Sequence, residues 1–236
     1  MFNGKESKMK SITFINLSGI SFNYFPTPAN KTIPDWYKKI EGYIGGKKTT
    51  NGEAKTNATI KKCIPVYDAI TGGYIIYTPV DIFVSQKDDA PYYEWPSLDA
   101  IQFHPIEQAP NHPNNNGFSY PKFMNPWGVK TSKGYSTLFI QPLHRESVFT
   151  ILPGIVDTDN YFVPVNFPFV LNDPTFEGLI PAGTPMAQLI PIKREKWKMI
   201  NANKDLENES KQIINSLNLT FFDRYKNKYW NRKDYK

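Results

Sequence analysis

The sequence is poor in cysteine and lacks long apolar runs. Cys63 is its one cysteine among 236 residues, so no disulfide can form within the chain and no cysteine-based zinc cluster can be built. No stretch approaches the roughly 20 apolar residues that a membrane-spanning helix requires. Residues 1–10 are not followed by an uninterrupted apolar segment, so we expect no secretory signal. These absences favour a protein of a reducing compartment that does not contact membranes.

Common catalytic motifs are absent as well. The sequence has no P-loop, no glycine fingerprint for dinucleotides and no Gly-x-Ser-x-Gly elbow. His104, His112 and His144 form no His-x-His or His-Glu-x-x-His pair, so we predict no metal site. We expect Cys63 to be a buried small hydrophobe, the alternative being a reactive thiol activated by the two preceding lysines.

The formal net charge of +6 is concentrated at the two ends of the chain. Residues 1–10 carry three lysines and one glutamate, and residues 218–236 carry six cationic side chains and two aspartates. Residues 11–217 therefore have no net charge. This distribution does not support a uniformly basic nucleic-acid-binding face on the body of the protein.

The abundance of proline and glycine predicts short strands joined by turns. The 20 prolines and 14 glycines divide the apolar residues into short runs, while a hydrophobic content of 40% suffices for a buried core. The expected strands lie at residues 12–17, 73–77, 80–84, 136–140, 148–151, 163–170 and 186–192. Pro191 indicates that the last of these ends, or lies at a sheet edge, near that residue. The predicted fold class is mostly β.

Helical periodicity is confined to two segments. Apolar residues recur at spacings near three and four over residues 194–217, which predicts an amphipathic helix. A shorter helix or turn is expected at residues 34–40, because Pro34 suits the first helical position. The predicted parts of the chain are a basic N-terminal tail at 1–10, a β domain at 11–193, a helix at 194–217 and a basic aromatic arm at 218–236.

Two turn-rich segments carry the most informative motifs. Residues 154–161 contain a glycine, two aspartates spaced two residues apart and a tyrosine. Residues 179–190 contain a Pro-x-Gly turn that leads into an Ala-Gln-Leu strand. Together the two segments resemble the third and fourth motifs of the trimeric dUTPase and dCTP deaminase superfamily. This resemblance implies a distorted β-barrel, or β-clip, and a homotrimer.

The resemblance also implies roles for individual residues. Asp157 matches the carboxylate that orients or deprotonates the attacking water. Tyr161 matches the aromatic residue under the deoxyribose, and Gln188 matches the side chain near the phosphates. If the chain is active, these roles imply a nucleotide pyrophosphatase, and Mg²⁺ is expected only in that case. The alternative is that both turns serve the fold alone, with the aspartates accepting hydrogen bonds from backbone N–H groups.

Three further residues are assigned to nucleotide binding. Asp68 takes the acidic position of a partial first motif, and His144 and Arg145 lie in the segment that replaces the phosphate-gripping second motif. Glu146 follows them, at a position where a triphosphate disfavours negative charge. The glycine-rich fifth motif is missing, and the aromatic arm takes its place. Phosphoryl transfer depends on positioning and charge stabilisation, so these departures favour a divergent or non-catalytic protein.

The chain as a whole resembles a family of phage and bacterial proteins to which no activity is assigned. The shared features are a Pro-x-Pro segment at 26–28, an aromatic pair at 36–37, a Cys-x-Pro strand at 62–65 and the hairpin at 154–159. A composition rich in lysine and asparagine, with only four arginines, is compatible with an AT-rich phage genome and equally with an AT-rich bacterium.

The arm at 218–236 has two interpretations. Its aromatic residues, interleaved with lysine and arginine, suit stacking on single-stranded bases combined with phosphate contacts. They equally suit an arm that packs its aromatic rings on a neighbouring subunit while its lysines stay in water. Exchanged arms are usual in dUTPase-like trimers, and the resemblance therefore favours the second interpretation.

Two functions from different classes follow from this reading. The first is a phage-encoded, dUTPase-like nucleotide-binding protein, divergent or non-catalytic, in nucleotide metabolism or host takeover. The alternative is a structural or accessory protein of the virion or its assembly that uses an oligomeric β-barrel module. The first places the protein in the host cytoplasm and the second in the virion.

Overall fold

A computed structural model describes residues 10–19, 21–49, 57–96, 99–108, 112–113, 119–218 and 223–236. The chain divides into two units by its internal contacts. Unit 1 comprises Met1–Thr27 and Gly73–Arg194, and unit 2 comprises Pro28–Gly72 and Glu195–Lys236. Residues 28–72, which the sequence analysis includes in the β domain, thus cluster with the C-terminal segment instead. Apart from Pro28, which pairs in a sheet, no described residue of this segment belongs to a strand of the sheets, and its regular elements are short helices and helical turns.

Unit 1 is built from antiparallel strands, joined by turns and one short 3-10 turn, η3 (Ile106–Gln108). The strands are β1 (Ile12–Asn16), β2 (Thr27–Pro28), β3 (Tyr74–Tyr77), β4 (Ile82–Lys87), β5 (Ala90–Glu94), β6 (Ile101–His104), β7 (Tyr120–Phe123), β8 (Trp127–Thr131), β9 (Tyr135–Ile140), β10 (Phe149–Ile151), β11 (Gly154–Val156), β12 (Phe167–Leu171), β13 (Gly178–Ile180) and β14 (Pro185–Lys193). The mostly β class is confirmed, and the seven predicted strands are found as β1, β3, β4, β9, β10, β12 and β14.

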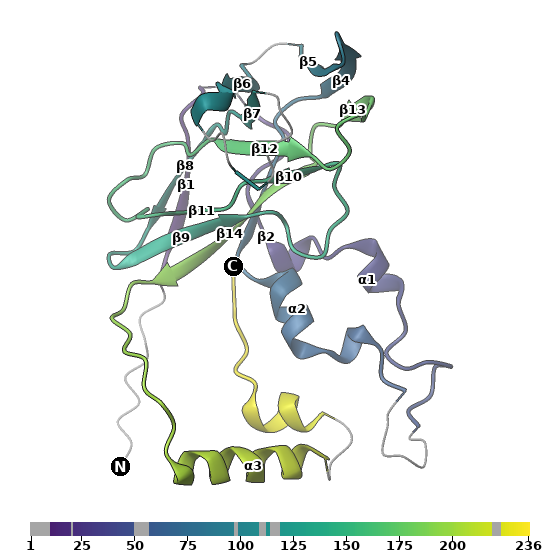
Figure 1. Cartoon of the computed structure of the whole chain (residues 1–236), viewed down its shortest axis with the longest axis vertical. Coiled ribbons are helices and arrows are strands. Elements are labelled where there is room, and N and C mark those ends of the chain that lie inside the picture. Colours follow the sequence, from purple (N-terminus) through teal and green to yellow (C-terminus); the bar gives the residue numbers. More distant parts are fainter. Residues whose placement is uncertain are drawn as a thin grey trace. The chain divides into compact units, whose positions relative to one another are not determined.

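The strands form four sheets, ordered β1-β8, β10-β12-β7-β6, β11-β9-β14-β3-β2 and β13-β4-β5. Among the described strands, no sheet closes into a barrel. In the largest sheet β14 lies between β9 and β3. Figure 1 shows β14 beside β9. Pairing with β3 ends at Leu189, whereas pairing with β9 continues to Lys193. Pro191 therefore lies where β14 has a free edge, as the missing N–H of proline requires.

Phenylalanine side chains fill the core between the sheets. Phe123 and Phe169 stack with ring centroids 3.9 Å apart, and Phe149 packs edge-on against Phe123 at 4.8 Å. Each of the three side chains is at most 1% exposed. On β12 buried residues alternate with half-buried ones, which is the period of two expected for a strand with one face in the core. Burial of such rings dominates the stability of a small core.

Gly73 precedes β3 at a position that only glycine can occupy without strain. Its φ is +71°, a region that side chains with a Cβ atom rarely adopt. A Cβ at this position would also overlap the backbone carbonyl oxygen of Leu189 on β14. The close approach of β3 and β14 therefore depends on the absence of a side chain at residue 73.

Replacing Gly73 by alanine should destabilise unit 1 strongly. An alanine at this position is strained by the positive φ, and its Cβ forces β3 away from β14. We therefore expect a loss of roughly 3 kcal/mol or more in the free energy of unfolding. Urea denaturation followed by circular dichroism measures the loss. Gly134→Ala is the matched control, because Gly134 has a φ of +87° and nothing within 4 Å of the added Cβ. A loss no larger than that of Gly134→Ala would contradict the role of the contact with Leu189.

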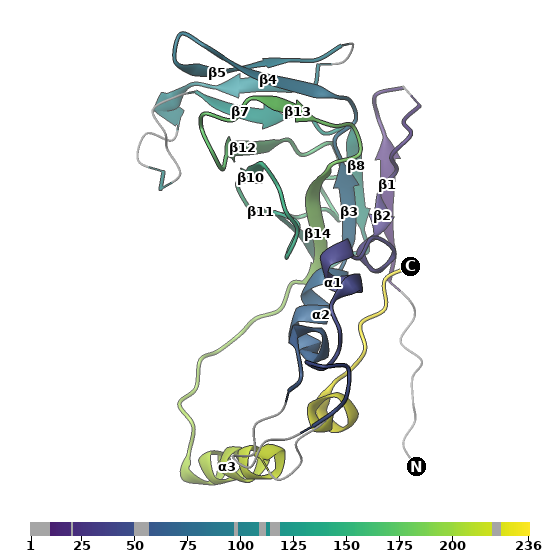
Figure 2. The same cartoon turned by 90° about the vertical axis from the view of Figure 1, so that its right-hand side faces the viewer.

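The described residues of unit 2 form three α-helices and shorter helical turns. These are η1 (Ala29–Lys31), α1 (Asp35–Lys39), η2 (Ile60–Lys62), α2 (Ile64–Thr71), α3 (Lys204–Asn218) and the π-helical turn η4 (Tyr225–Tyr229). The predicted short helix is confirmed as α1, which begins directly after Pro34. Helices α1 and α2 lie side by side (Figure 2). The rings of Tyr37 and Tyr67 make contact between them, with centroids 6.4 Å apart.

The segment predicted as a Cys-x-Pro strand is instead the start of α2. Pro65 lies in the first turn of the helix, where its missing N–H has no partner to lose. Cys63 is the residue before the helix and is exposed, so the expectation of a buried cysteine is wrong. The backbone N–H of Cys63 donates to Ile60 at 3.0 Å, closing a surface turn that leaves the thiol at the protein surface.

The C-terminal helix is shorter than the predicted 194–217. Helix α3 begins at Lys204 because Asn203 caps it, its Oδ1 accepting the N–H of Leu206 at 3.0 Å. Residues 195–203 form no helix, and this segment leaves Trp197 and Met199 87% and 92% exposed. Among the described helices, none has the length and apolar character needed to cross a membrane.

Candidate functional site

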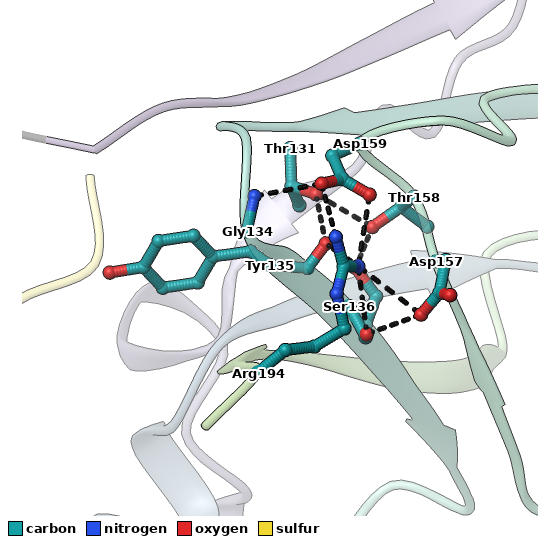
Figure 3. Close-up of polar contacts among 9 residues, drawn as sticks. Thr131, Gly134, Tyr135, Ser136, Asp157, Thr158, Asp159 and Arg194 are labelled. Atoms are coloured by element: carbon teal, nitrogen blue, oxygen red, sulfur yellow. Dashed lines mark hydrogen bonds and ion pairs between the residues drawn. The ribbon is translucent and has the colours of Figure 1, made fainter. Parts of the chain in front are cut away.

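The turn after β11 carries an ion-pair cluster that fixes the end of β14. Arg194, the residue after β14, donates from Nη1 to Asp159 Oδ1 at 2.9 Å and from Nη2 to Asp159 Oδ2 (Figure 3). The N–H of Gly134 donates to the same carboxylate at 2.7 Å. The Arg194 guanidinium, followed by the Gly134 N–H, lowers the pKa of Asp159 to about 2. This bidentate pair is the strongest geometry available to two such groups.

Asp157 belongs to the same cluster. Its Oδ1 accepts the Ser136 hydroxyl at 2.6 Å and lies 3.2 Å from Arg194 Nη1. The Asp157 side chain is nevertheless 61% exposed. Between the two aspartates, the buried Thr158 hydroxyl contacts those of Thr131 and Thr137 at 2.8 and 2.7 Å. The predicted aspartate pair therefore anchors a turn to β9 and β14, which is the structural interpretation left open by the sequence.

Of the other predicted nucleotide-binding residues of unit 1, Tyr161 follows the turn that contains Asp157, and the rest lie elsewhere. Tyr161 is 57% exposed, and its N–H donates to the carbonyl of Asp157 at 2.8 Å. Gln188 is fully buried in β14, and its Oε1 accepts the N–H of Leu143 at 2.9 Å. Because Leu143 precedes His144 and Arg145, these three predicted residues share one region of unit 1.

The structure does not bring this region together with Asp157. Gln188 pairs with Ile140 of β9, whereas Asp157 bonds to Ser136, four residues earlier on the same strand. Four residues of β-strand span about 13 Å, so Asp157 and Gln188 lie near opposite ends of β9. His144 is exposed and adopts a φ of +56°, and burial lowers the pKa of the Arg145 guanidinium while nearby Tyr77 opposes that shift.

Asp68, the sixth predicted residue, is in unit 2 on α2. Its carboxylate accepts the indole N–H of Trp230 at 2.9 Å and pairs with Lys233 Nζ at 2.6 Å. Asn30 adds a further bond from Nδ2 to the carbonyl of Tyr235 at 3.1 Å. The arm predicted at 218–236 is described from residue 223, and it folds back on its own unit through these contacts.

Beside these contacts, unit 2 has a cavity of about 640 Å³. Its cationic side chains come from both halves of the unit: Lys61, Lys62, Lys226 and Arg232. Asp223 is the one carboxylate among its described lining residues. The larger cavity, as we call it, thus has an excess of positive charge suited to an anionic ligand.

Aromatic rings line the same cavity. Tyr37, Tyr67 and Trp230 contribute them, from α1, α2 and the residue after η4. The Tyr37 hydroxyl donates to the Lys61 carbonyl at 3.2 Å, and burial raises the pKa of this tyrosine. A concave site with aromatic walls and a few charged groups is typical of small-ligand binding.

This cavity was not predicted from the sequence. Asp68 and the basic aromatic arm were singled out, but the carboxylate was assigned to a nucleotide motif and the arm to a neighbouring subunit or a nucleic acid. Lysines from residues 61–62 and 226 meet only through tertiary contacts between distant segments, for which the sequence carries no local signal.

Compared with protein-family models and with curated proteins, the chain matches none. In the part of the chain that the structure describes, no group of three or more His, Cys, Asp and Glu side chains is arranged to hold a metal ion. The candidate site is therefore argued from the geometry of unit 2 alone.

Acid should release the ion-pair cluster of unit 1. The pKa of Asp159 is depressed in the folded state from 3.8 to about 2, so the stability it contributes is present above about pH 4 and is lost as the pH falls toward 2. We expect Asp159→Asn to be less stable than the wild type at neutral pH, and the difference to narrow through this window. Urea unfolding at a series of pH values measures it.

Glu94→Gln, at an exposed carboxylate of β5, is the control for removing one acidic group. Its stability relative to the wild type should change little over the same range. If the difference in stability between the wild type and Asp159→Asn stays constant down to pH 2, the stabilising role of the ion pair between Asp159 and Arg194 is contradicted.

Proposed function

We propose that this protein binds a nucleotide in the larger cavity of unit 2 without hydrolysing it. The observation that carries the proposal is the combination of four cationic and three aromatic side chains around one cavity of about 640 Å³. A phosphate requires positive charge, and a base requires a flat apolar wall on which to stack. Both requirements are met within one site, whose volume is in the range typical of small-ligand pockets.

Charged contacts give the nucleotide an orientation. Lys226 and Arg232 come from the C-terminal segment and Lys61 from the turn before α2. Lys61 Nζ already donates to the carbonyl of Lys38 at 2.7 Å, which holds its ammonium group at the wall of the cavity. Trp230, held by Asp68, supplies the stacking surface for the base. The phosphate therefore lies toward Lys226 and Arg232.

The absence of turnover is part of the proposal. Hydrolysis of a phosphate ester requires a positioned base for water together with charge stabilisation of the transferred group. Asp223, the carboxylate at the cavity, stands among lysines that favour its role as a counter-charge. Asp157, the base expected from the motif resemblance, is bonded to Ser136 and Arg194 in the other unit.

The dUTPase-like, β-clip relationship and a phage origin remain part of this proposal. The relationship is supported by the strands β11 and β14, which carry parts of the two motif segments and flank β9 in one sheet. A composition rich in lysine and asparagine is compatible with the phage origin. In a divergent member of that superfamily, the ancestral nucleotide site would be replaced by the cavity of unit 2. Nucleotide metabolism or host takeover is the process that such a binding protein would serve.

Removing the phosphate-binding charges should weaken nucleotide binding. We expect Lys226→Ala and Arg232→Ala each to raise the dissociation constant for a deoxynucleoside monophosphate about tenfold, because a charge-assisted hydrogen bond contributes roughly 1.5–3 kcal/mol. Isothermal titration calorimetry of the full chain with the four deoxynucleoside monophosphates measures the change. Thin-layer chromatography of the same mixtures should show intact nucleotide.

Lys228→Ala is the matched control, because Lys228 lies two residues after Lys226 on η4 but its ammonium group faces the ring of Tyr229 at 5.4 Å. Its affinity should equal that of the wild type. No heat of binding at millimolar nucleotide, or equal losses in Lys226→Ala and Lys228→Ala, would overturn the proposed site.

A second candidate function is assembly with further copies of this chain. The observation that favours it is the exposure of Trp197, Met199 and Ile200, which are 87%, 92% and 80% exposed in the segment before α3. Such large apolar side chains, adjacent in sequence and in water, are typical of a protein interface. The homotrimer expected from the motif resemblance would cover them with a second copy.

Charge in this segment should abolish any such oligomer. We expect the wild type to sediment as an oligomer and the double variant Trp197→Glu, Met199→Glu as a monomer, because a buried interface does not tolerate two unpaired carboxylates. Analytical ultracentrifugation measures the mass. The exposed Lys196→Glu, Lys198→Glu pair serves as the control for added negative charge. A monomeric wild type would exclude self-assembly through this segment.

A further inference from the structure

The larger cavity has a smaller neighbour. This second cavity measures about 290 Å³ and, like the first, is lined only by residues of unit 2. The two cavities have four lining residues in common, namely Lys62, Ile64, Asp223 and Lys226. They are therefore adjoining compartments of one site, and these shared residues form the boundary between them.

The boundary is mainly cationic. Lys62 comes from η2 and Lys226 from η4, so two ammonium groups from segments far apart in the sequence border both compartments. Asp223 supplies a single opposing carboxylate, which can accept an N–H group from a base. A group that bridges the compartments at this boundary is favoured when it is negatively charged.

The smaller cavity has aromatic walls of its own. Tyr43 and Tyr225 line it, and neither belongs to the lining of the larger cavity. The Nζ of Lys62 lies 4.9 Å from the centroid of the Tyr43 ring, a cation–π contact that orients the ammonium group at the boundary. Each compartment thus offers its own surface for a flat ring, with positive charge between them.

We propose that the two cavities together bind one ligand made of two nucleosides joined by a phosphate. The inference rests on the proposed function, to which it adds the class of ligand. One base stacks in the larger cavity against Trp230 and the other in the smaller cavity against Tyr43. The linking phosphate contacts Lys62 and Lys226. Such a ligand is either a free dinucleotide or two consecutive residues of a single strand.

The test compares ligands that differ by one base. Calorimetry of the full chain uses dAMP, dADP and the 5′-phosphorylated dinucleotide of deoxyadenosine. We expect the dinucleotide to bind about fivefold or more tightly than dADP, which has a second phosphate but no second base, because one stacked base contributes at least that factor. Equal affinities for dADP and the dinucleotide would overturn the inference while leaving the proposed function in place.

Variants separate the compartments. Tyr43→Ala should remove the advantage of the dinucleotide and leave the affinity for dAMP unchanged, and Tyr225→Ala should act in the same direction. Tyr92→Ala is the matched control, since Tyr92 is likewise a tyrosine with a lysine, Lys87, over its ring, at 5.2 Å, but it lies on β5 of unit 1. If Tyr43→Ala loses dAMP and dinucleotide affinity equally, the two-compartment inference is contradicted.

A further ligand distinguishes a free dinucleotide from two consecutive residues of a single strand. A ten-residue oligodeoxyadenylate that binds at least as tightly as the dinucleotide supports a single strand as the source, because the chain then continues out of both cavities. Exclusion of the oligonucleotide, with dinucleotide binding retained, supports a free dinucleotide. No binding by any of the ligands overturns both the inference and the proposed function, whereas binding of dAMP alone overturns the inference only.

Discussion

The carboxylate of Asp68 holds unit 2 together. It lies on α2, is 19% exposed, and accepts both the Trp230 indole N–H and the ammonium group of Lys233. These bonds fix the C-terminal segment against the helices, and that segment contributes Lys226, Trp230 and Arg232 to the larger cavity. Without this one acceptor, the indole would lose its partner and the cavity would lose a wall. The proposed ligand site therefore depends on a residue that positions an aromatic ring.

The sequence predicted unit 1 better than unit 2, and the reason is physical. Strands with several β-branched and aromatic residues, such as β3 and β9, carry a local signal that burial then reinforces. Among the strands that were missed, β5 contains Pro91, β7 contains Pro121 and β11 starts at Gly154, residues that weaken this signal. Their pairing partners stabilise them, and pairing is not readable from a single segment. Helix α2 was missed as well, because it is only eight residues long and carries Pro65 in its first turn.

The candidate site could be predicted only in parts. Asp157 was assigned a functional role and Asp159 was noted beside it, but no local pattern indicates that Arg194, 35 residues beyond Asp159, pairs with both. Aromatic and basic residues of the arm were recognised as a binding feature, because their composition is unusual in itself. Which surface they serve depends on Asp68, 162 residues before Trp230. Contacts of this separation arise from the fold and leave no periodic pattern in the chain.

The long separation of Asp68 and Trp230 along the chain affects the order in which the two units fold. Helix α2 leaves the ribosome early, and at ordinary elongation rates its partner Trp230 follows roughly ten to thirty seconds later. Closing so long a loop costs entropy in an unfolded chain. Unit 1 removes most of this cost, because its second segment begins at Gly73 and ends at Arg194, next to the paired strands β3 and β14. Pairing of β3 with β14 brings the chain after Arg194 back toward Gly73, so unit 2 is completed last.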